Sequence, residues 1–298
     1  MSRVLSTTEG THRGTFSPLD WSLFLAVGAI WGSSFILIHA GLDAFRPGLV
    51  TWIRVGSGAA ALWLVPKARP AIAPEDRPRL VVLSFLWVAI PFTLFPLAQQ
   101  HVDSAVAGMM NGGMPIVAAA ISSAMLRRAP RAVQVLGLVL GSAGVATIAL
   151  STAGEGGSEA FGVLLLLGAI LCYGLAINIA APLQQRYGSL RVMARMLGLA
   201  AIWTAPFGLA SIPGSRFAWG PLAAVLALGA VGTGFAFVCM GLLVGRVGST
   251  RASFATYLVP VVAMALGAVV LGERVAPVAA AGVAAVIAGA VLASRREA

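Results

Sequence analysis

Long apolar stretches whose interiors carry no acidic side chain dominate the sequence. A bilayer core about 30 Å thick is crossed by a helix of about 20 apolar residues, and ten stretches have roughly that length. Their bounds are 20–40, 48–65, 80–99, 104–126, 132–150, 160–182, 191–211, 218–244, 250–272 and 277–293. Only 10% of the residues are charged, against roughly one quarter in an average soluble domain. The composition therefore excludes an ordinary soluble enzyme and predicts a multi-pass membrane protein.

Each span must satisfy its own backbone hydrogen bonds in hydrocarbon, which helices do and isolated strands cannot. The sequence therefore predicts an all-α membrane protein with ten transmembrane helices. The first span follows a polar segment and is followed at once by another span, so we expect it to be retained and not cleaved as a signal peptide.

Basic residues predict the orientation, because short cytoplasmic loops are enriched in Lys and Arg. With the N-terminus inside, fifteen basic residues fall in cytoplasmic segments and three, Arg46, Arg216 and Arg274, fall in outer loops. Both termini are therefore predicted to be cytoplasmic. The net charge of +10 does not indicate a nucleic-acid partner, because these residues are scattered through short loops and do not form one face.

The chain resembles itself at a shift of 145 residues. Residues 106–148 and 251–293 share ten identities, including Pro115 with Pro260 and Gly144 with Gly289. The predicted organisation is a tail over 1–19, a five-helix unit over 20–150, an outer linker over 151–159, a second five-helix unit over 160–293 and a tail over 294–298. An odd number of spans places the second unit upside down. Such inverted repeats favour a central cavity near the midplane and alternating access.

Three groups of residues carry a family resemblance. The run 245–253, then Tyr257-Leu258-Val259-Pro260 and Leu271-Gly272-Glu273-Arg274, resembles the C-terminal repeat of the EamA-type drug/metabolite transporter superfamily. The run 31–35 and Arg54 resemble the opening of its N-terminal repeat. The resemblance implies a bacterial inner-membrane transporter, similar to ten-helix exporters of amino acids, including aromatic ones. The first half departs from the pattern, with Arg127-Arg128 where the second half has Gly272-Glu273.

Charged groups inside the spans are few, and no carboxylate lies deep in one. His39 and His101 fall near outer span ends, where they are either interfacial residues or members of a proton relay. Arg54 lies about six residues inside the second span and either snorkels, pairs with helix carbonyls or binds a substrate carboxylate. Arg195 lies nearer the inner surface, where snorkelling is expected.

An amino-acid site at the midplane needs aromatic faces together with neutral polar groups. The predicted substrate-binding residues are Trp31, Ser34, Asn111, Met114, Tyr173, Asn178, Phe235 and Tyr257. Each aromatic residue also has plain helix packing or lipid contact as an alternative. An amide in hydrocarbon either bonds a neighbouring helix or lines a wet cavity, and both alternatives stay open for the two asparagines.

Prolines and glycines suggest mechanical roles. Pro115 and Pro260 are repeat mates and are predicted either as gating hinges or as fixed kinks that shape a cavity. The small-residue rows of the fifth and tenth spans suit close helix packing; they comprise Gly137, Gly141, Gly144, Gly282 and Gly289.

The predicted function is an alternating-access transporter that exports amino acids, particularly aromatic and other apolar ones. The alternatives are a multidrug or other metabolite exporter and a passive channel. An intramembrane enzyme is not expected, because no metal motif, Ser/His pair or aspartate cluster is present. No cofactor or metal is expected either, and Cys172 and Cys239 lie in apolar segments as buried thiols.

Overall fold

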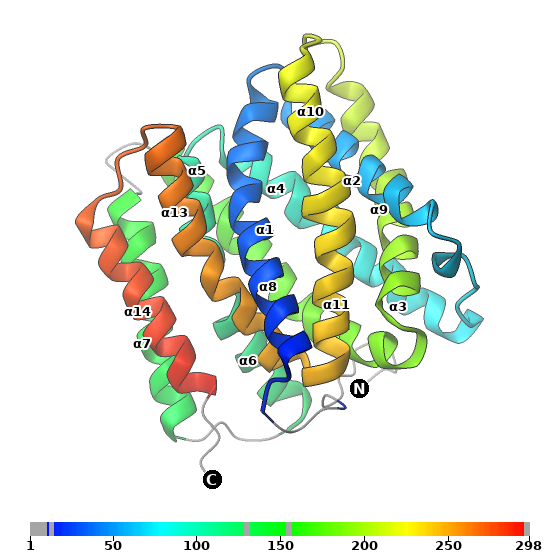
Figure 1. The fold of residues 1–298 in the computed structure, drawn as a ribbon. Helices are drawn as coiled ribbons and strands as arrows, with labels where there is room; N and C mark the ends of the chain where they lie inside the picture. Colours follow the sequence, from blue (N-terminus) through cyan, green and yellow to red (C-terminus); the bar gives the residue numbers. More distant parts are fainter. Residues whose placement is uncertain (1–10, 12–14, 128–131, 153–156, 295–298) are drawn as a thin grey trace.

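The computed structural model describes residues 11, 15–127, 132–152 and 157–294, and within these ranges it contains helices and no strand (Figure 1). Most of the two predicted tails, and residues 153–156 of the predicted outer linker, fall outside those ranges. The α-helices of the N-terminal half are α1 (Pro18–Leu42), α2 (Pro47–Trp63), α3 (Arg77–Leu83), α4 (Ile90–Ala98), α5 (Ser104–Asn111), α6 (Met114–Met125) and α7 (Ala132–Thr152). Those of the C-terminal half are α8 (Gly157–Tyr187), α9 (Ser189–Ala210), α10 (Trp219–Ala227), α11 (Ala236–Val247), α12 (Ser249–Ser253), α13 (Leu258–Val270) and α14 (Pro277–Ser294).

Seven helical segments within the described ranges are long and apolar enough to cross a membrane. They are Pro18–Leu42, Pro74–Ala98, Ser104–Met125, Glu159–Tyr187, Ser189–Ala210, Trp219–Val247 and Arg251–Val270. The other three predicted spans coincide with α2 and with the shorter apolar parts of α7 and α14. The prediction of an all-helical membrane protein is confirmed, while the count of ten spans stays a prediction.

Several spans are interrupted. Ser84–Ala89 (η3) and Leu228–Phe235 (η4) are π-helical, and they join α3 to α4 and α10 to α11. A turn at residues 112–113 separates α5 from α6, and the 3-10 helix Phe254–Tyr257 (η5) separates α12 from α13. Short 3-10 helices also cover Pro66–Ala68 (η1) and Pro74–Asp76 (η2). The interruptions therefore recur in both halves of the chain.

Helices α7 and α14 pack along each other at one side of the bundle (Figure 1). A Cβ added at Gly144 would lie 2.6 Å from the Gly282 carbonyl oxygen and 2.7 Å from the Val286 nitrogen. One added at Gly289 would meet the backbone of Gly141. The backbones approach this closely because side chains are absent there, which confirms the predicted role of the small-residue rows.

The remaining helices interleave the two halves of the chain. Helix α1 packs against α10, α11 and α13, whereas α4 and α6 pack against α8, and α2 packs against α9. One continuous cluster of buried apolar side chains contains residues from both halves, from Leu23 to Val286. The core is therefore shared between the halves.

Helix α1 begins and α14 ends at the same end of the bundle, the lower end of Figure 1. Ser17 and Asp20 form a capping box at the start of α1, and the Asp20 carboxylate pairs with Arg246 Nε of α11 at 2.6 Å. Arg186 at the end of α8 pairs with Asp76 at 2.6 Å and with Glu75 at 3.1 Å. These five acidic and basic residues lie in or beside segments that the sequence predicts to be cytoplasmic.

Candidate functional site

A cavity with an empty volume of about 470 Å³ lies among helices from both halves of the chain. Its walls are formed by Trp31, Ser34, Phe35 and Ile38 of α1, Arg54 of α2, Trp87 of η3, Phe92 and Phe95 of α4, Asn111 of α5, Met114 of α6, Tyr173 of α8, Phe237 of α11 and Thr256 of η5.

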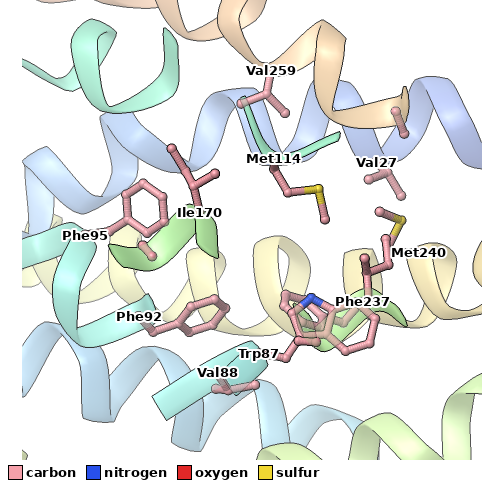
Figure 2. Packing of buried hydrophobic residues seen from close by; sticks show 14 of the residues in the cluster. Val27, Trp87, Val88, Phe92, Phe95, Met114, Ile170, Phe237, Met240 and Val259 are labelled. Carbon is pink, nitrogen blue, oxygen red and sulfur yellow. The ribbon is translucent and has the colours of Figure 1, made fainter. Parts of the chain in front are cut away.

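Phe237 is the centre of one aromatic cluster in the wall. Its ring centroid lies 5.2 Å from that of Trp31, 5.4 Å from that of Trp87 and 5.7 Å from that of Phe92. Figure 2 shows Trp87 and Phe237 lying against each other, with the Met114 side chain pointing toward them. Such tilted and edge-to-face pairs hold the rings in fixed orientations, so this wall is a rigid apolar surface.

Phe95 is the centre of a second aromatic cluster. Its ring packs edge-on against Phe35, with the centroids 5.4 Å apart, and stacks on Tyr173 of the other half at 5.8 Å. The cavity therefore has aromatic groups on two sides, contributed by both halves, and these can bury an apolar side chain of a ligand.

The π-helical turn η4 positions two of the lining residues. Thr233 Oγ1 donates a hydrogen bond to the Leu228 carbonyl oxygen, five residues back, at 3.1 Å, and accepts one from Arg54 Nε at 2.9 Å. Trp31 Nε1 donates to the Gly232 carbonyl oxygen at 3.1 Å. Irregular backbone at membrane depth is tolerated where other groups satisfy it, and here Trp31 and the Thr233 hydroxyl bond two carbonyl oxygens of η4.

A proline in α4 gives α2 a second anchor. Pro96 has no N–H, so it cannot bond the carbonyl oxygen of Phe92 four residues back. The single O–H of Thr51 lies 2.8 Å from that freed oxygen and 3.0 Å from the Pro47 carbonyl oxygen, and it donates to both. Thr51 and Arg54 are three residues apart and therefore share a face of α2. The same contact brings the Arg54 guanidinium over the Phe92 ring, with Cζ 3.6 Å from its centroid.

The polar groups of the cavity differ in how far the protein satisfies them. Ser34 Oγ donates to the Ile30 carbonyl oxygen at 3.0 Å, and Thr256 Oγ1 donates to the Ser253 carbonyl oxygen at 2.7 Å. Asn111 is only 5% exposed, yet its Oδ1 has no hydrogen-bond partner among the described residues. Asn111 Oδ1 is therefore a buried acceptor that the described residues leave without a donor.

Five of the eight predicted substrate-binding residues line the cavity: Trp31, Ser34, Asn111, Met114 and Tyr173. Asn178 does not, because it is fully buried between helices. Its Nδ2 donates to the carbonyl oxygens of Ala118 and Gly174, and its Oδ1 accepts from Ser249 Oγ at 2.9 Å. The two asparagines thus follow the two alternatives for an amide in a span: Asn178 bonds neighbouring helices and Asn111 faces a cavity.

The other two predicted residues also lie outside the cavity. Phe235 is 54% exposed on the outer surface, and Tyr257 stacks on Phe254 with the ring centroids 5.4 Å apart. Their near neighbours Phe237 and Thr256 line the cavity in their place. Thr256 is the repeat mate of Asn111 at the shift of 145 residues, and this relation could have identified it.

The predicted hinge prolines both follow interruptions of their helices. Pro115 is the second residue of α6, directly after the turn at 112–113, and Pro260 is the third residue of α13, directly after η5. Arg195 lies apart from the cavity, where it donates to the carbonyl oxygens of Ala68 and Arg69 at 2.8 and 2.6 Å. Within the described ranges, no group of three or more His, Cys, Asp or Glu side chains could hold a metal ion.

Comparison with known proteins gives matches over nearly the whole chain. The model of the EamA-like transporter family matches twice, over residues 21–150 and 160–295. The transporter YoaV of Bacillus subtilis is 26% identical over 258 residues, which are 84% of this chain and 88% of that protein. A protein of Streptantibioticus cattleyicolor, named "Probable terminal-alkyne amino-acid exporter", is 28% identical over 281 residues, 93% of each chain. A solved crystal structure has the same fold with a TM-score of 0.66 at 19% identity, covering 92% of this chain and 96% of that one.

Proposed function

Because the chain belongs to the EamA-like transporter family, we propose that it is an alternating-access carrier that exports amino acids with aromatic and other apolar side chains. The observation that carries the proposal is the cavity between the halves, which combines aromatic walls with an unsatisfied amide oxygen. An apolar α-amino acid has a side chain that fits the first and an ammonium group that can donate to the second. The name of the Streptantibioticus relative supports the same substrate class.

The proposal includes ten spans in two inverted five-helix units. Symmetry-related contacts support it: α4 packs on α8 as α1 packs on α11, and α6 packs on α8 as α13 packs on α1. The π-helical segments η3 and η4 fall at matching positions at the shift of 145 residues. The two matches of the family model, one to each half, also support two repeated units.

The proposed orientation has both termini in the cytoplasm of a bacterium and the carrier in its inner membrane. Ala71 and Pro213 lie in exposed loops on opposite sides in this arrangement. Single cysteines at these positions, in a background lacking Cys172 and Cys239, test it with a membrane-impermeant thiol reagent. Pro213→Cys is expected to react in intact cells and Ala71→Cys only after permeabilisation. Reaction of both from outside would refute the inverted arrangement.

Counterflow in proteoliposomes tests the function. Labelled phenylalanine, threonine, lysine and a cationic dye are offered outside, with or without unlabelled phenylalanine inside. A carrier for apolar amino acids is expected to take up labelled phenylalanine faster when the vesicles contain unlabelled phenylalanine. The cavity then carries unlabelled substrate outward and reopens to the labelled substrate outside. Uptake without acceleration would indicate a channel, and dye uptake without amino-acid uptake would indicate a multidrug exporter.

A matched pair of variants ties the flux to the cavity. Met114→Trp would fill the space that the Met114 side chain borders, and is expected to abolish counterflow. Phe235→Trp changes an exposed outer residue and is expected to leave counterflow intact. Equal flux in both variants would place the transport path elsewhere.

We also propose Pro115 and Pro260 as the hinges of alternating access, since each lies in the first turn of a helix that follows an interruption of its span. Pro115→Ala and Pro260→Ala are expected to slow counterflow while leaving substrate binding unchanged. Undiminished flux in both variants would refute the hinge role and leave the prolines as fixed kinks that shape the cavity.

A further inference from the structure

Arg54 is a buried cation that the described protein leaves without a carboxylate. It is 4% exposed and borders the cavity, where its Nε donates a hydrogen bond to Thr233 and its guanidinium lies over the Phe92 ring. None of the described acidic residues pairs with it. Burying an unpaired charge is costly, so buried charges are usually paired. Since the described residues supply no carboxylate for Arg54, a bound ligand can supply one.

The two Nη groups of the Arg54 guanidinium have no hydrogen-bond partner among the described residues. Nε is used by Thr233, and no hydrogen bond within the described ranges involves either Nη atom. The two Nη groups carry four N–H donors in a plane, which match the two oxygens of a carboxylate. Thr233 and the Phe92 ring fix the guanidinium in place before a ligand arrives. A site that is already ordered loses less entropy on binding.

Asn111 supplies an independent observation in the same cavity. Its side chain is more than nine-tenths buried, and Oδ1 accepts no hydrogen bond among the described residues. A carbonyl oxygen in this position can be satisfied only by a donor, such as an ammonium group. Arg54 thus offers donors to an anionic group, and Asn111 offers an acceptor to a cationic or neutral donor.

We propose that Arg54 binds the carboxylate of the transported substrate and that Asn111 Oδ1 accepts a hydrogen bond from its ammonium group. The inference rests on the proposed function and narrows it to zwitterions whose apolar side chain packs on the aromatic walls. Arg54 is the only charged residue among the described cavity-lining side chains. A cationic drug therefore meets repulsion there and no compensating carboxylate, which argues against the multidrug alternative.

Analogues of phenylalanine separate the two contacts on the unmodified protein. 3-Phenylpropionate keeps the carboxylate without the ammonium group, and phenethylamine keeps the ammonium group without the carboxylate. Competition with labelled phenylalanine is expected to be strong with phenylalanine, intermediate with 3-phenylpropionate and weakest with phenethylamine, because the charged bidentate contact is the stronger one. Stronger inhibition by phenethylamine than by 3-phenylpropionate would overturn the assignment of Arg54.

Variants assign the contacts to residues. Arg54→Gln is expected to raise the KM for phenylalanine at least about tenfold and to abolish inhibition by 3-phenylpropionate, since a site built for a polar group discriminates strongly. Arg54→Lys keeps the charge without the fork and is expected to fall between. Asn111→Leu should weaken phenylalanine binding and leave that of 3-phenylpropionate unchanged. Arg195→Gln is the matched control, because this arginine bonds backbone carbonyls away from the cavity.

Ligand-induced thermal stabilisation keeps the inference falsifiable if a variant transports poorly. Folded Arg54→Gln protein is expected to lose its stabilisation by 3-phenylpropionate, whereas Arg195→Gln protein keeps it. Phenylalanine transport with an unchanged KM in Arg54→Gln would overturn the inference and leave the proposed function standing. Absence of amino-acid transport by the unmodified protein would refute the proposed function. In that case, 3-phenylpropionate binding that depends on Arg54 would still support an anion contact, and its absence would overturn that contact too.

Discussion

Replacing Glu273 is predicted to loosen the junction between the two halves at the end opposite the helix α1 start. The Glu273 carboxylate follows the end of α13 and reaches the start of α5. Its Oε1 accepts hydrogen bonds from Ser104 N at 3.0 Å and Ser104 Oγ at 2.7 Å, and its Oε2 accepts one from Ala105 N at 2.9 Å. From the segment between α13 and α14 it thus performs the role of an N-cap for α5, where a negative charge also complements the helix dipole.

The expected magnitude follows from these three bonds. Loss of an N-cap costs about 1 kcal/mol and a charge-assisted hydrogen bond about 1.5–3 kcal/mol. Because the site is only partly buried, we expect Glu273→Ala to lower the free energy of unfolding by about 2–4 kcal/mol. Gln keeps one acceptor oxygen and places an NH2 against an N–H donor, so Glu273→Gln is expected to cost about half as much, roughly 1–2 kcal/mol. Unfolding in mixed micelles with increasing SDS measures both variants.

Gly267 provides a thermodynamic cycle that tests the cause. A Cβ added at Gly267 would meet Glu273 Oε2, so Gly267→Ala should displace the carboxylate and lose the same bonds. The double variant is then expected to be less destabilised than the sum of the two single variants by about 1 kcal/mol or more. Additive effects, or single variants within about 0.5 kcal/mol of the unmodified protein, would refute the capping argument.

Three further predictions concern packing, a freed carbonyl and pH. Gly144→Ala should lower the free energy of unfolding by about 1–3 kcal/mol in the same assay, because the added methyl group meets the backbone of α14. Gly56→Ala is the control: a Cβ there has nothing within 4 Å, so this variant should be neutral or slightly stabilising. Thr51→Val should lower the free energy of unfolding by about 1–2 kcal/mol, because the Phe92 carbonyl oxygen, which Pro96 cannot bond, then loses the Thr51 donor. An unchanged free energy of unfolding would contradict this. Burial and the nearby Glu273 carboxylate raise the pKa of Asp103, so the native state holds that proton more tightly than the unfolded chain and stability rises as the pH falls through the raised pKa. Asp103→Asn should therefore raise the apparent melting temperature near pH 7, and the gain should shrink toward about pH 4; a gain independent of pH would contradict the charge argument.

The sequence predicted those parts of the fold that depend on hydrophobicity and residue size alone. Apolar length identified the helical segments, and glycine spacing identified the close contact of α7 with α14. The interruptions were not predicted, because a π-helical turn such as η4 keeps the same apolar composition as an α-helix. What distinguishes it is the contacts from distant parts of the sequence: Trp31 bonds the Gly232 carbonyl oxygen, and Arg54 bonds the Thr233 hydroxyl.

The same limit explains the site residues that sequence reasoning placed or missed. Phe235 and Phe237 differ by two residues, or about 200° around a helix, so only one of them can face the cavity. The extra residue in a π-helical turn changes the face that follows it, and Phe237 is the one that lines the cavity. Arg54 was visible as a charge inside a span, but its orientation depends on Thr233 of the other half.

The position of the interruptions joins the fold to the proposed transport cycle. A broken helix exposes backbone groups, and hydrocarbon tolerates this only where protein or a water-filled cavity satisfies them. In this chain η3, the turn at 112–113, η4 and η5 each contribute to or adjoin a cavity-lining residue, namely Trp87, Asn111 and Met114, Phe237, and Thr256. The breaks of the two halves correspond at a shift of 145 residues. A fixed scaffold would gain nothing from four weakened points around one cavity, whereas a carrier that must open that cavity to each side in turn needs helices that can bend beside it.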